Sequence, residues 1–206
     1  MTSDEELLAT WRQGDRKAGE RLFNRYYVPI GRFFANKAPE DGDDLIQETF
    51  MACLQARDQI RNGGGFRPYL FAVATNVLRM HFRRRLRCGP WEPIDEARSL
   101  DLAPGPSTII HNAEEQGVLL EALQRLPLRQ QVALELRYWE RMTTEDIGCV
   151  LDLPVGTVRS HLHRGRRQLE KLLLTMPLAE RVRRSTLGDL DGWADSLREV
   201  VTRNCA

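Results

Sequence analysis

The apolar residues of this chain recur at helical spacing along almost its whole length. Apolar side chains three, four and seven residues apart form one face of an α-helix, whereas a half-buried strand alternates apolar and polar residues. Two such stripes follow one another in the second half of the chain: Leu119, Ala122, Leu123 and Leu126, and then Leu128, Val132, Leu136 and Trp139. Alternating runs are absent from the sequence. We therefore expect an all-α fold.

Three helices are expected in the first part of the chain. Ser3 and Glu6 have the spacing of a capping box, which opens a first helix whose apolar pattern continues as far as Tyr27. A second helix is expected over about 43–60 and a third over about 67–87. One face of the second helix is expected to carry Leu45, Ile46, Thr49, Phe50, Cys53 and Leu54. The last of these ends in a run of arginines.

A proline-rich segment divides the chain. Residues 89–111 hold four of the ten prolines and show no apolar period, which is typical of a linker. We expect the following organisation: a helical domain over 1–88, a linker over 89–112, a second helical domain over 113–175 and a C-terminal helical extension over 176–206. The extension has its own apolar stripe, which either packs on the second domain or masks a binding surface.

Composition excludes several classes of protein. The 30 basic and 29 acidic residues nearly cancel, so any nucleic-acid surface must arise from local segregation of charge. The acidic start argues against a signal peptide, and the longest uncharged apolar stretch, 68–78, is about half of the roughly 20 residues that span a bilayer. The cysteines are too dispersed for a zinc site or a disulfide framework: Cys53, Cys88, Cys149 and Cys205. We expect a cytoplasmic protein without a metal or cofactor.

The most specific local pattern covers residues 143–169. A helix of about a dozen residues, a tight turn and a second helix opened by Pro154 form the layout of a helix-turn-helix, with Pro154 expected at the first helical position. Polar and basic side chains occupy the second helix outside its apolar face: Arg159, Ser160, His161, His163, Arg164, Arg166 and Arg167. Such a helix can enter the major groove of DNA. The alternative is an ordinary helical hairpin with a solvated basic face.

Charge is segregated within the first domain. Residues 40–48 carry five carboxylates and no basic residue, and residues 79–87 carry five arginines and no acid. We expect one surface that repels DNA and another that attracts phosphates. The carboxylates of Asp43, Asp44 and Glu48 lack a nearby histidine, so a solvated face is preferred to acid–base catalysis, and the chain is not expected to be an enzyme.

Aromatic residues precede the basic run. Phe66, Tyr69 and Phe71 lie at the start of the third expected helix, where they either stack on bases exposed by strand separation or belong to the core.

In combination these segments resemble the bacterial sigma factors of the extracytoplasmic-function group. The matching segments are DDLIQETF (43–50), FRPYLFAVATNVLRMHFRRRLR (66–87), LQRLPLRQQVALELRYWERMTTEDIGCVLDL (123–153) and PVGTVRSHLHRGRRQL (154–169). The resemblance implies a region 2 domain that binds core RNA polymerase and melts the minus-ten element, and a region 4 domain that recognises the minus-thirty-five element. Two positions depart from the family's usual residues: Gly148 replaces alanine and Asp152 replaces glycine.

The resemblance also implies roles for individual residues. Those expected to meet the polymerase clamp helices are Asp44, Gln47, Glu48 and Phe50. Those expected at the minus-ten element are Asn62, Gly63, Phe66, Asn76, Arg79, His81, Arg83 and Arg84. Those expected at the minus-thirty-five element are Pro154, Gly156, Thr157, Arg159, Ser160, His163 and Arg164. The polymerase flap, promoter DNA and an anti-sigma factor, which often holds such proteins at the membrane, are the implied partners.

One alternative stays open. A two-domain helix-turn-helix regulator would bind duplex DNA without being a polymerase subunit. Regulators of that kind usually carry a receiver or ligand-binding domain with strands, and residues 1–88 show no strand pattern.

Overall fold

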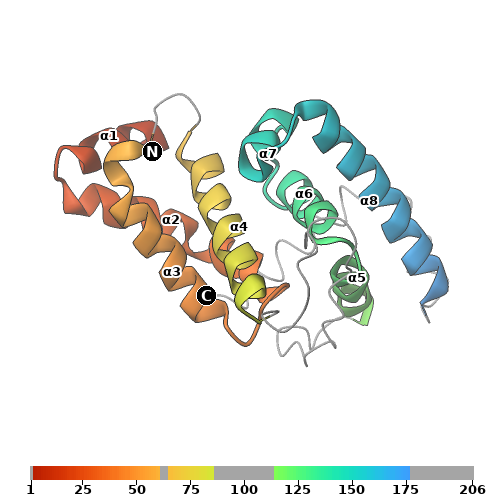
Figure 1. Cartoon of the computed structure of the whole chain (residues 1–206). Coiled ribbons are helices and arrows are strands. Elements are labelled where there is room, and N and C mark those ends of the chain that lie inside the picture. Colours follow the sequence, from red (N-terminus) through yellow and green to blue (C-terminus); the bar gives the residue numbers. More distant parts are fainter. Residues whose placement is uncertain (1, 61–64, 86–113, 177–206) are drawn as a thin grey trace. The chain divides into compact units, whose positions relative to one another are not determined.

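The computed structural model describes residues 2–60, 65–85 and 114–176. Within them the regular structure is helical, with no β-strand, which confirms the all-α prediction (Figure 1). The α-helices are α1 (Asp4–Arg12), α2 (Arg16–Ala35), α3 (Gly42–Gln55), α4 (Phe66–Arg85), α5 (Glu114–Gln124), α6 (Leu128–Tyr138), α7 (Thr144–Leu151) and α8 (Val155–Thr175). The expected linker over 89–112 and the extension beyond Met176 lie outside the described residues.

The chain divides into two compact units. Helices α1–α4 belong to the first unit, which also takes in Gly148–Leu153, and the remaining parts of α5–α8 belong to the second. In the first unit α1 packs on α2, α2 on α3 and α3 on α4 (Figure 1). Its core is formed by fully buried side chains, among them Leu22, Ile30, Phe34, Leu70, Phe71 and Leu78.

The first expected helix is two helices. Ser3 and Glu6 form the predicted capping box at the start of α1, but this helix ends at Arg12. Gly14 has a φ of +102°, a conformation that residues with a side chain rarely adopt, and it turns the chain. Asp15 then caps α2 by accepting hydrogen bonds from the backbone N–H groups of the next helix. The uninterrupted apolar periodicity had concealed this break.

Helices α1 and α2 approach closely at Gly19. A Cβ atom at this position would lie 2.5 Å from ring atoms of Trp11, which is itself 4% exposed. The absence of a side chain at Gly19 therefore lets the indole of α1 lie directly on α2.

The second expected helix is shorter than the sequence indicated. Helix α3 ends at Gln55, and a short 3₁₀ helix, Arg57–Gln59, follows. The third expected helix is present as α4 over its described residues.

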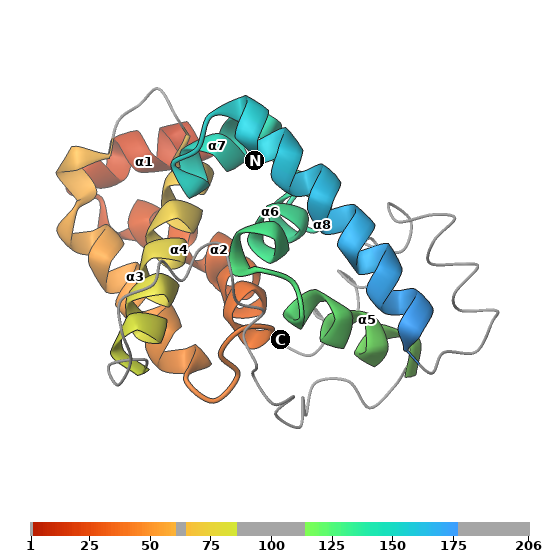
Figure 2. The ribbon, with the colours of Figure 1, turned by 45° about the vertical axis from the view of Figure 1, so that its right-hand side comes forward.

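The second unit is built on α5, α6 and α8. Helix α8 packs on both α5 and α6 (Figure 2). Both apolar stripes predicted from the sequence are buried along their whole length. Gly165 marks the close approach of α8 to α6, because a Cβ atom there would lie 3.2 Å from both Gln130 Cβ and Leu134 Cδ1. Among the described helices, none combines the length and apolar character needed to cross a bilayer.

Candidate nucleic-acid interface

The turn between α7 and α8 has the local geometry of a helix-turn-helix. Thr143 caps α7 by accepting a hydrogen bond from the backbone N–H of Asp146, 3.1 Å away. Asp152 adopts a left-handed conformation with a φ of +56°. Two expectations were wrong in detail. Helix α7 has eight residues rather than about a dozen, and Pro154 is the N-cap of α8 rather than its first helical residue.

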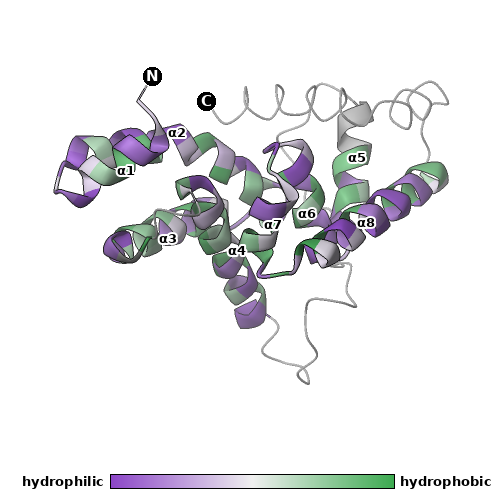
Figure 3. Cartoon of the chain, turned by 90° about the horizontal axis from the view of Figure 1, so that it is seen from above, coloured by the Kyte–Doolittle hydropathy of each residue, from purple (hydrophilic) through white to green (hydrophobic). Residues whose placement is uncertain are grey.

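The side chains predicted to read the minus-thirty-five element lie on the accessible side of α8. Pro154, Gly156, Arg159, Ser160, His163 and Arg164 are exposed and Thr157 is half-buried. Residues three, four, seven and eight positions apart share one helix face. A Cβ atom at Gly156 would meet nothing within 4 Å, so open space lies beside the first turn of this face. Figure 3 shows hydrophilic residues distributed along α8.

Arg159 has an electrostatic neighbour on α7. The pKa of Glu145 is lowered, first by the hydrogen bond from its own backbone N–H, then by its bond to the Thr144 hydroxyl, with a smaller attraction from Arg159. The Glu145 carboxylate is therefore charged at neutral pH.

Helix α4 separates the residues predicted for the minus-ten element into two groups. Asn76, Arg79 and Arg83 fall on one face at spacings of three and four residues, and Arg79 Nη1 lies 3.5 Å from Asn76 Oδ1. Met80 lies on the same face, is 47% exposed and was missed by the sequence reasoning. His81 faces α3 instead, with 14% of its side chain exposed, so its expected DNA contact is not supported.

Phe66 is a second correction. Its ring is 1% exposed and packs among aromatic side chains, 5.6 Å from Tyr26 and 6.4 Å from Phe23 between ring centroids. Burial of this ring favours the core role that the sequence left open. Phe71 is likewise buried, and Tyr69 is half-buried. Asn62 and Gly63 lie outside the described residues.

Helix α3 presents an exposed stripe that begins with two of the predicted polymerase contacts. Asp44 and Gln47 are exposed, and Met51 and Leu54 continue the same face with 47% and 46% exposure. The apolar spacing of this helix had predicted Leu54 on its apolar face and had indicated no role for Met51. The spacing 44, 47, 51 and 54 contained this signal, because these positions share a helix face.

Phe50 and Glu48 point away from the α3 stripe. The Phe50 ring is half-buried, and its centroid lies 4.9 Å from that of Phe23 and 6.4 Å from that of Tyr27, whose ring is stacked on it. Glu48 is directed toward α4, where its Oε1 atom lies 3.3 Å from Arg84 Nη2.

The two charge clusters meet, contrary to the expectation of separate surfaces. Arg85 Nη1 also lies 3.3 Å from Asp41 Oδ2, and His81 Nε2 lies 3.5 Å from the same oxygen. The packing of α3 on α4 brings the beginning of one helix to the end of the other (Figure 1). The hydrophilic end of α4 is visible in Figure 3.

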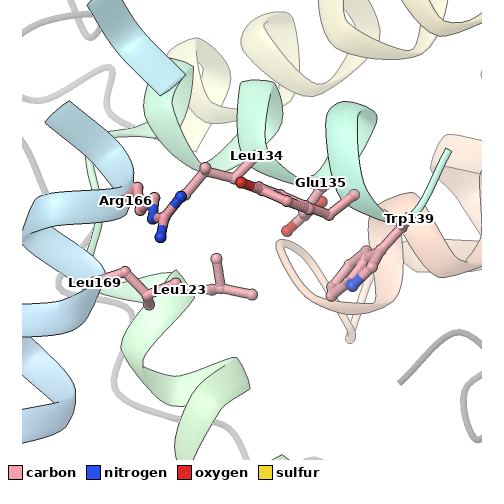
Figure 4. A pocket seen from close by; sticks show the side chains of 7 residues that line it. Leu123, Leu134, Glu135, Trp139, Arg166 and Leu169 are labelled. Carbon is pink, nitrogen blue, oxygen red and sulfur yellow. The ribbon is translucent and has the colours of Figure 1, made fainter. Parts of the chain in front are cut away.

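A small apolar pocket lies in the second unit between α5, α6 and α8 (Figure 4). Its lining residues are Leu123, Leu134, Glu135, Tyr138, Trp139, Arg166 and Leu169. Glu135 is buried and accepts a hydrogen bond from Gln131 Nε2 at 3.1 Å. Arg166 pairs with Glu170 along α8 at 3.2 Å.

Two sequence profiles of one family match the chain. The profile of sigma-70 region 2 matches residues 25–88, and that of sigma-70 region 4 matches residues 116–169. Together they cover more than half of the 206 residues, in the family's order. The chain belongs to the sigma-70 family.

Curated relatives agree that this sigma factor is of the extracytoplasmic-function type. The ECF RNA polymerase sigma-E factors of Salmonella typhimurium and Escherichia coli K12 are each 26% identical over 177 residues, covering 82% of this chain and 93% of theirs. The sigma-E factor of Haemophilus influenzae is 28% identical, with 94% of its length covered.

Two solved structures of similar fold are complexes. CnrH, solved with the cytosolic domain of CnrY, is 25% identical with a TM-score of 0.59, and the match covers 82% of this chain and 96% of CnrH. RpoE of Bartonella quintana, solved with the anti-sigma factor NepR, shares the fold at 20% identity and a TM-score of 0.58, over 78% and 98% of the two chains.

In this sigma factor Asp152 replaces the family's usual glycine at a position whose backbone is left-handed, a conformation that aspartate tolerates better than most residues.

No cluster of three or more His, Cys, Asp or Glu side chains suitable for a metal ion occurs within the described ranges. Burial raises the pKa of the Cys53 thiol to about 12, so this thiol stays protonated, whereas Cys149 on α7 is exposed.

Proposed function

We propose that the two units of this sigma factor divide promoter recognition between them. Sigma factors bind core RNA polymerase, direct it to promoters and help to open the minus-ten element. The proposal assigns polymerase binding and the minus-ten element to the first unit, through α3 and α4, and the minus-thirty-five element to α8. The observation that carries this assignment is the exposed polar face of α8, the helix that follows the left-handed turn at Asp152.

The recognition face of α8 has the chemistry that base reading needs. A guanidinium donates two parallel hydrogen bonds to guanine O6 and N7, and hydroxyl and imidazole groups bond other base edges. Arg159, Ser160 and His163 supply these groups within two helical turns, all exposed. Arg164 and Arg167 extend the positive charge toward the phosphates.

Helix α4 is assigned to the opened minus-ten strand. Extruding a base from the duplex costs a few kcal/mol, which contacts to the separated strand must offset. The amide of Asn76 suits hydrogen bonding to a base edge, and Arg83 suits the phosphate backbone. Met80 adds an exposed apolar contact between them.

The exposed stripe of α3, defined by Asp44, Gln47, Met51 and Leu54, is assigned to the polymerase. It joins a carboxylate to two exposed apolar side chains, a combination that fits a partner with basic and apolar groups.

Asp44→Arg is expected to lower affinity for core polymerase at least tenfold, because it places like charge against a basic surface. Glu20→Arg is the matched control, since Glu20 is exposed on α2, outside the stripe, and undergoes the same charge reversal. The affinity of each full-length variant for core polymerase would be measured at one ionic strength. Equal affinities of Asp44→Arg and the control would refute the assignment of α3.

We also propose that an anti-sigma factor binds this chain in the cytoplasm. The complexes of CnrH with CnrY and of RpoE with NepR support this, as does the cytoplasmic site of transcription. The proposal gives the chain no catalytic activity of its own, because a sigma factor acts as a regulatory subunit.

The deciding experiment combines the purified chain, core RNA polymerase and a library of promoter fragments. Specific initiation, with permanganate-reactive thymines near minus ten only when both proteins are present, is the expected result. Sequence-specific duplex binding without polymerase, and no opening with it, would overturn the proposal in favour of a regulator that acts on duplex DNA.

A further inference from the structure

Two arginines of the basic run at the end of α4 are already paired with carboxylates of α3 and its N-cap, and one of them, Arg84, was expected at the minus-ten element. Arg84 Nη2 lies 3.3 Å from Glu48 Oε1, and Arg85 Nη1 lies 3.3 Å from Asp41 Oδ2. Both pairs join the N-cap or the first half of α3 to the end of α4 within the first unit, where the two helices pack side by side (Figures 1 and 2).

The pairing is selective. Arg83 is exposed and makes no ion pair with any residue in the described ranges. On the acidic side, Glu40 and Asp43 are also exposed and form no ion pair within those ranges. Residues 40–48 carry five acids and residues 79–87 carry five arginines. Among these, helix packing brings Glu48 to Arg84 and Asp41 to Arg85.

We propose that Glu48 and Asp41 compete with DNA for Arg84 and Arg85 in the free protein. A carboxylate beside a guanidinium neutralises its charge and occupies one of its N–H donors, so the pair weakens the attraction of that guanidinium for a phosphate. This inference rests on the proposed function, because it takes the end of α4 as a surface that contacts DNA.

The two ion pairs are exposed enough to solvent for their carboxylates to be displaced reversibly by DNA phosphates. The four side chains are between 38% and 58% exposed, so solvent screens each pair and exchange of partners is inexpensive. Exposed pairs of this kind change an equilibrium constant by about 1.5- to 5-fold. Releasing one arginine should tighten DNA binding by that factor and steepen the logarithmic salt dependence by up to about one unit.

The test compares isosteric substitutions that remove the same charge. Glu48→Gln is compared with Glu40→Gln, and Asp41→Asn with Asp43→Asn, since only the first member of each comparison removes an ion pair. Asp41 makes no side-chain capping bond to α3, so its replacement leaves the helix start intact. The affinity of the full-length free chain for random-sequence duplex DNA would be measured over a range of salt concentrations.

Glu48→Gln and Asp41→Asn are expected to bind DNA about 1.5- to 5-fold more tightly than their controls. A common increase in all four variants would reflect net charge alone and would overturn the inference. So would unchanged affinity in all four.

Removing Arg84 tests whether Glu48 acts through it. In an Arg84→Ala background, Glu48→Gln should give no gain beyond that of Glu40→Gln, because the arginine to be released is absent. An undiminished gain would overturn the inference for this pair.

Promoter opening with polymerase separates this inference from the function on which it rests. If the wild-type chain opens promoters with polymerase while the four variants bind DNA alike, the proposed function stands and the inference fails. If the wild-type chain never opens a promoter, the proposed function fails, regardless of how the DNA affinities of the four variants compare.

Discussion

Replacing Arg159 by alanine is expected to weaken binding to the minus-thirty-five element by about 1–3 kcal/mol, a loss of about 5- to 150-fold. Arg159 is exposed at the start of α8, beside the charged carboxylate of Glu145. A hydrogen bond to a base edge forms only on the correct DNA sequence, so removing Arg159 costs affinity only there. The binding constant should therefore fall on promoter DNA and change little on scrambled DNA.

Lys171→Ala is the matched control for Arg159. Lys171 is an exposed basic residue of the same helix, twelve positions further along and outside the predicted recognition face. Its loss should lower the affinities for promoter DNA and for scrambled DNA equally, and only slightly. The measurement is the ratio of affinities for promoter and scrambled DNA, with polymerase holoenzyme containing each variant. If Arg159→Ala lowers both affinities equally, the residue contacts phosphate rather than a base.

Gly19→Ala and Gly31→Ala are expected to shift stability in opposite directions, although both change a glycine of α2 to alanine. At Gly19 the new methyl group would lie 2.5 Å from the buried Trp11 ring, so the ring must move. Overpacking of this kind costs about 1–3 kcal/mol, only partly offset by the roughly 1 kcal/mol that alanine gains over glycine in a helix. Gly19→Ala should therefore be destabilising.

At Gly31 the methyl group would lie 3.6 Å from Ile46 Cδ1, which is ordinary van der Waals contact. Gly31→Ala should therefore stabilise the first unit by about 0.5–1 kcal/mol through helix propensity alone. Urea denaturation midpoints of the two variants and the wild-type chain provide the measurement. Similar midpoints for the two variants would show that Trp11 does not pack on Gly19.

Much of the architecture followed from local pattern. The helices of both units, the capping box at Ser3 and the left-handed turn at Asp152 depend on side-chain spacing and on contacts within a few residues. Such features are visible in a sequence because the interacting residues are neighbours along the chain. The break at Gly14 was missed because the apolar period continues across it, while a single backbone angle ends the helix.

The candidate site needed tertiary information. Phe66 and Phe71 have mostly half-buried neighbours in the sequence, and only the packing of α2 against α4 determines that their own rings are buried. The exposed face of α3 was likewise misjudged at Leu54, because helical spacing shows that residues share a face but not which face a neighbouring helix covers.

The sequence by itself determined that this chain is all-α, that it carries a helix-turn-helix and that charge is segregated into two segments, since composition and period are properties of the chain alone. Only the tertiary structure decided that the two charged segments meet. Glu48 and Arg84 are separated by 36 positions, and Asp41 and Arg85 by 44. Their pairing depends on how α3 lies against α4, which no local rule specifies.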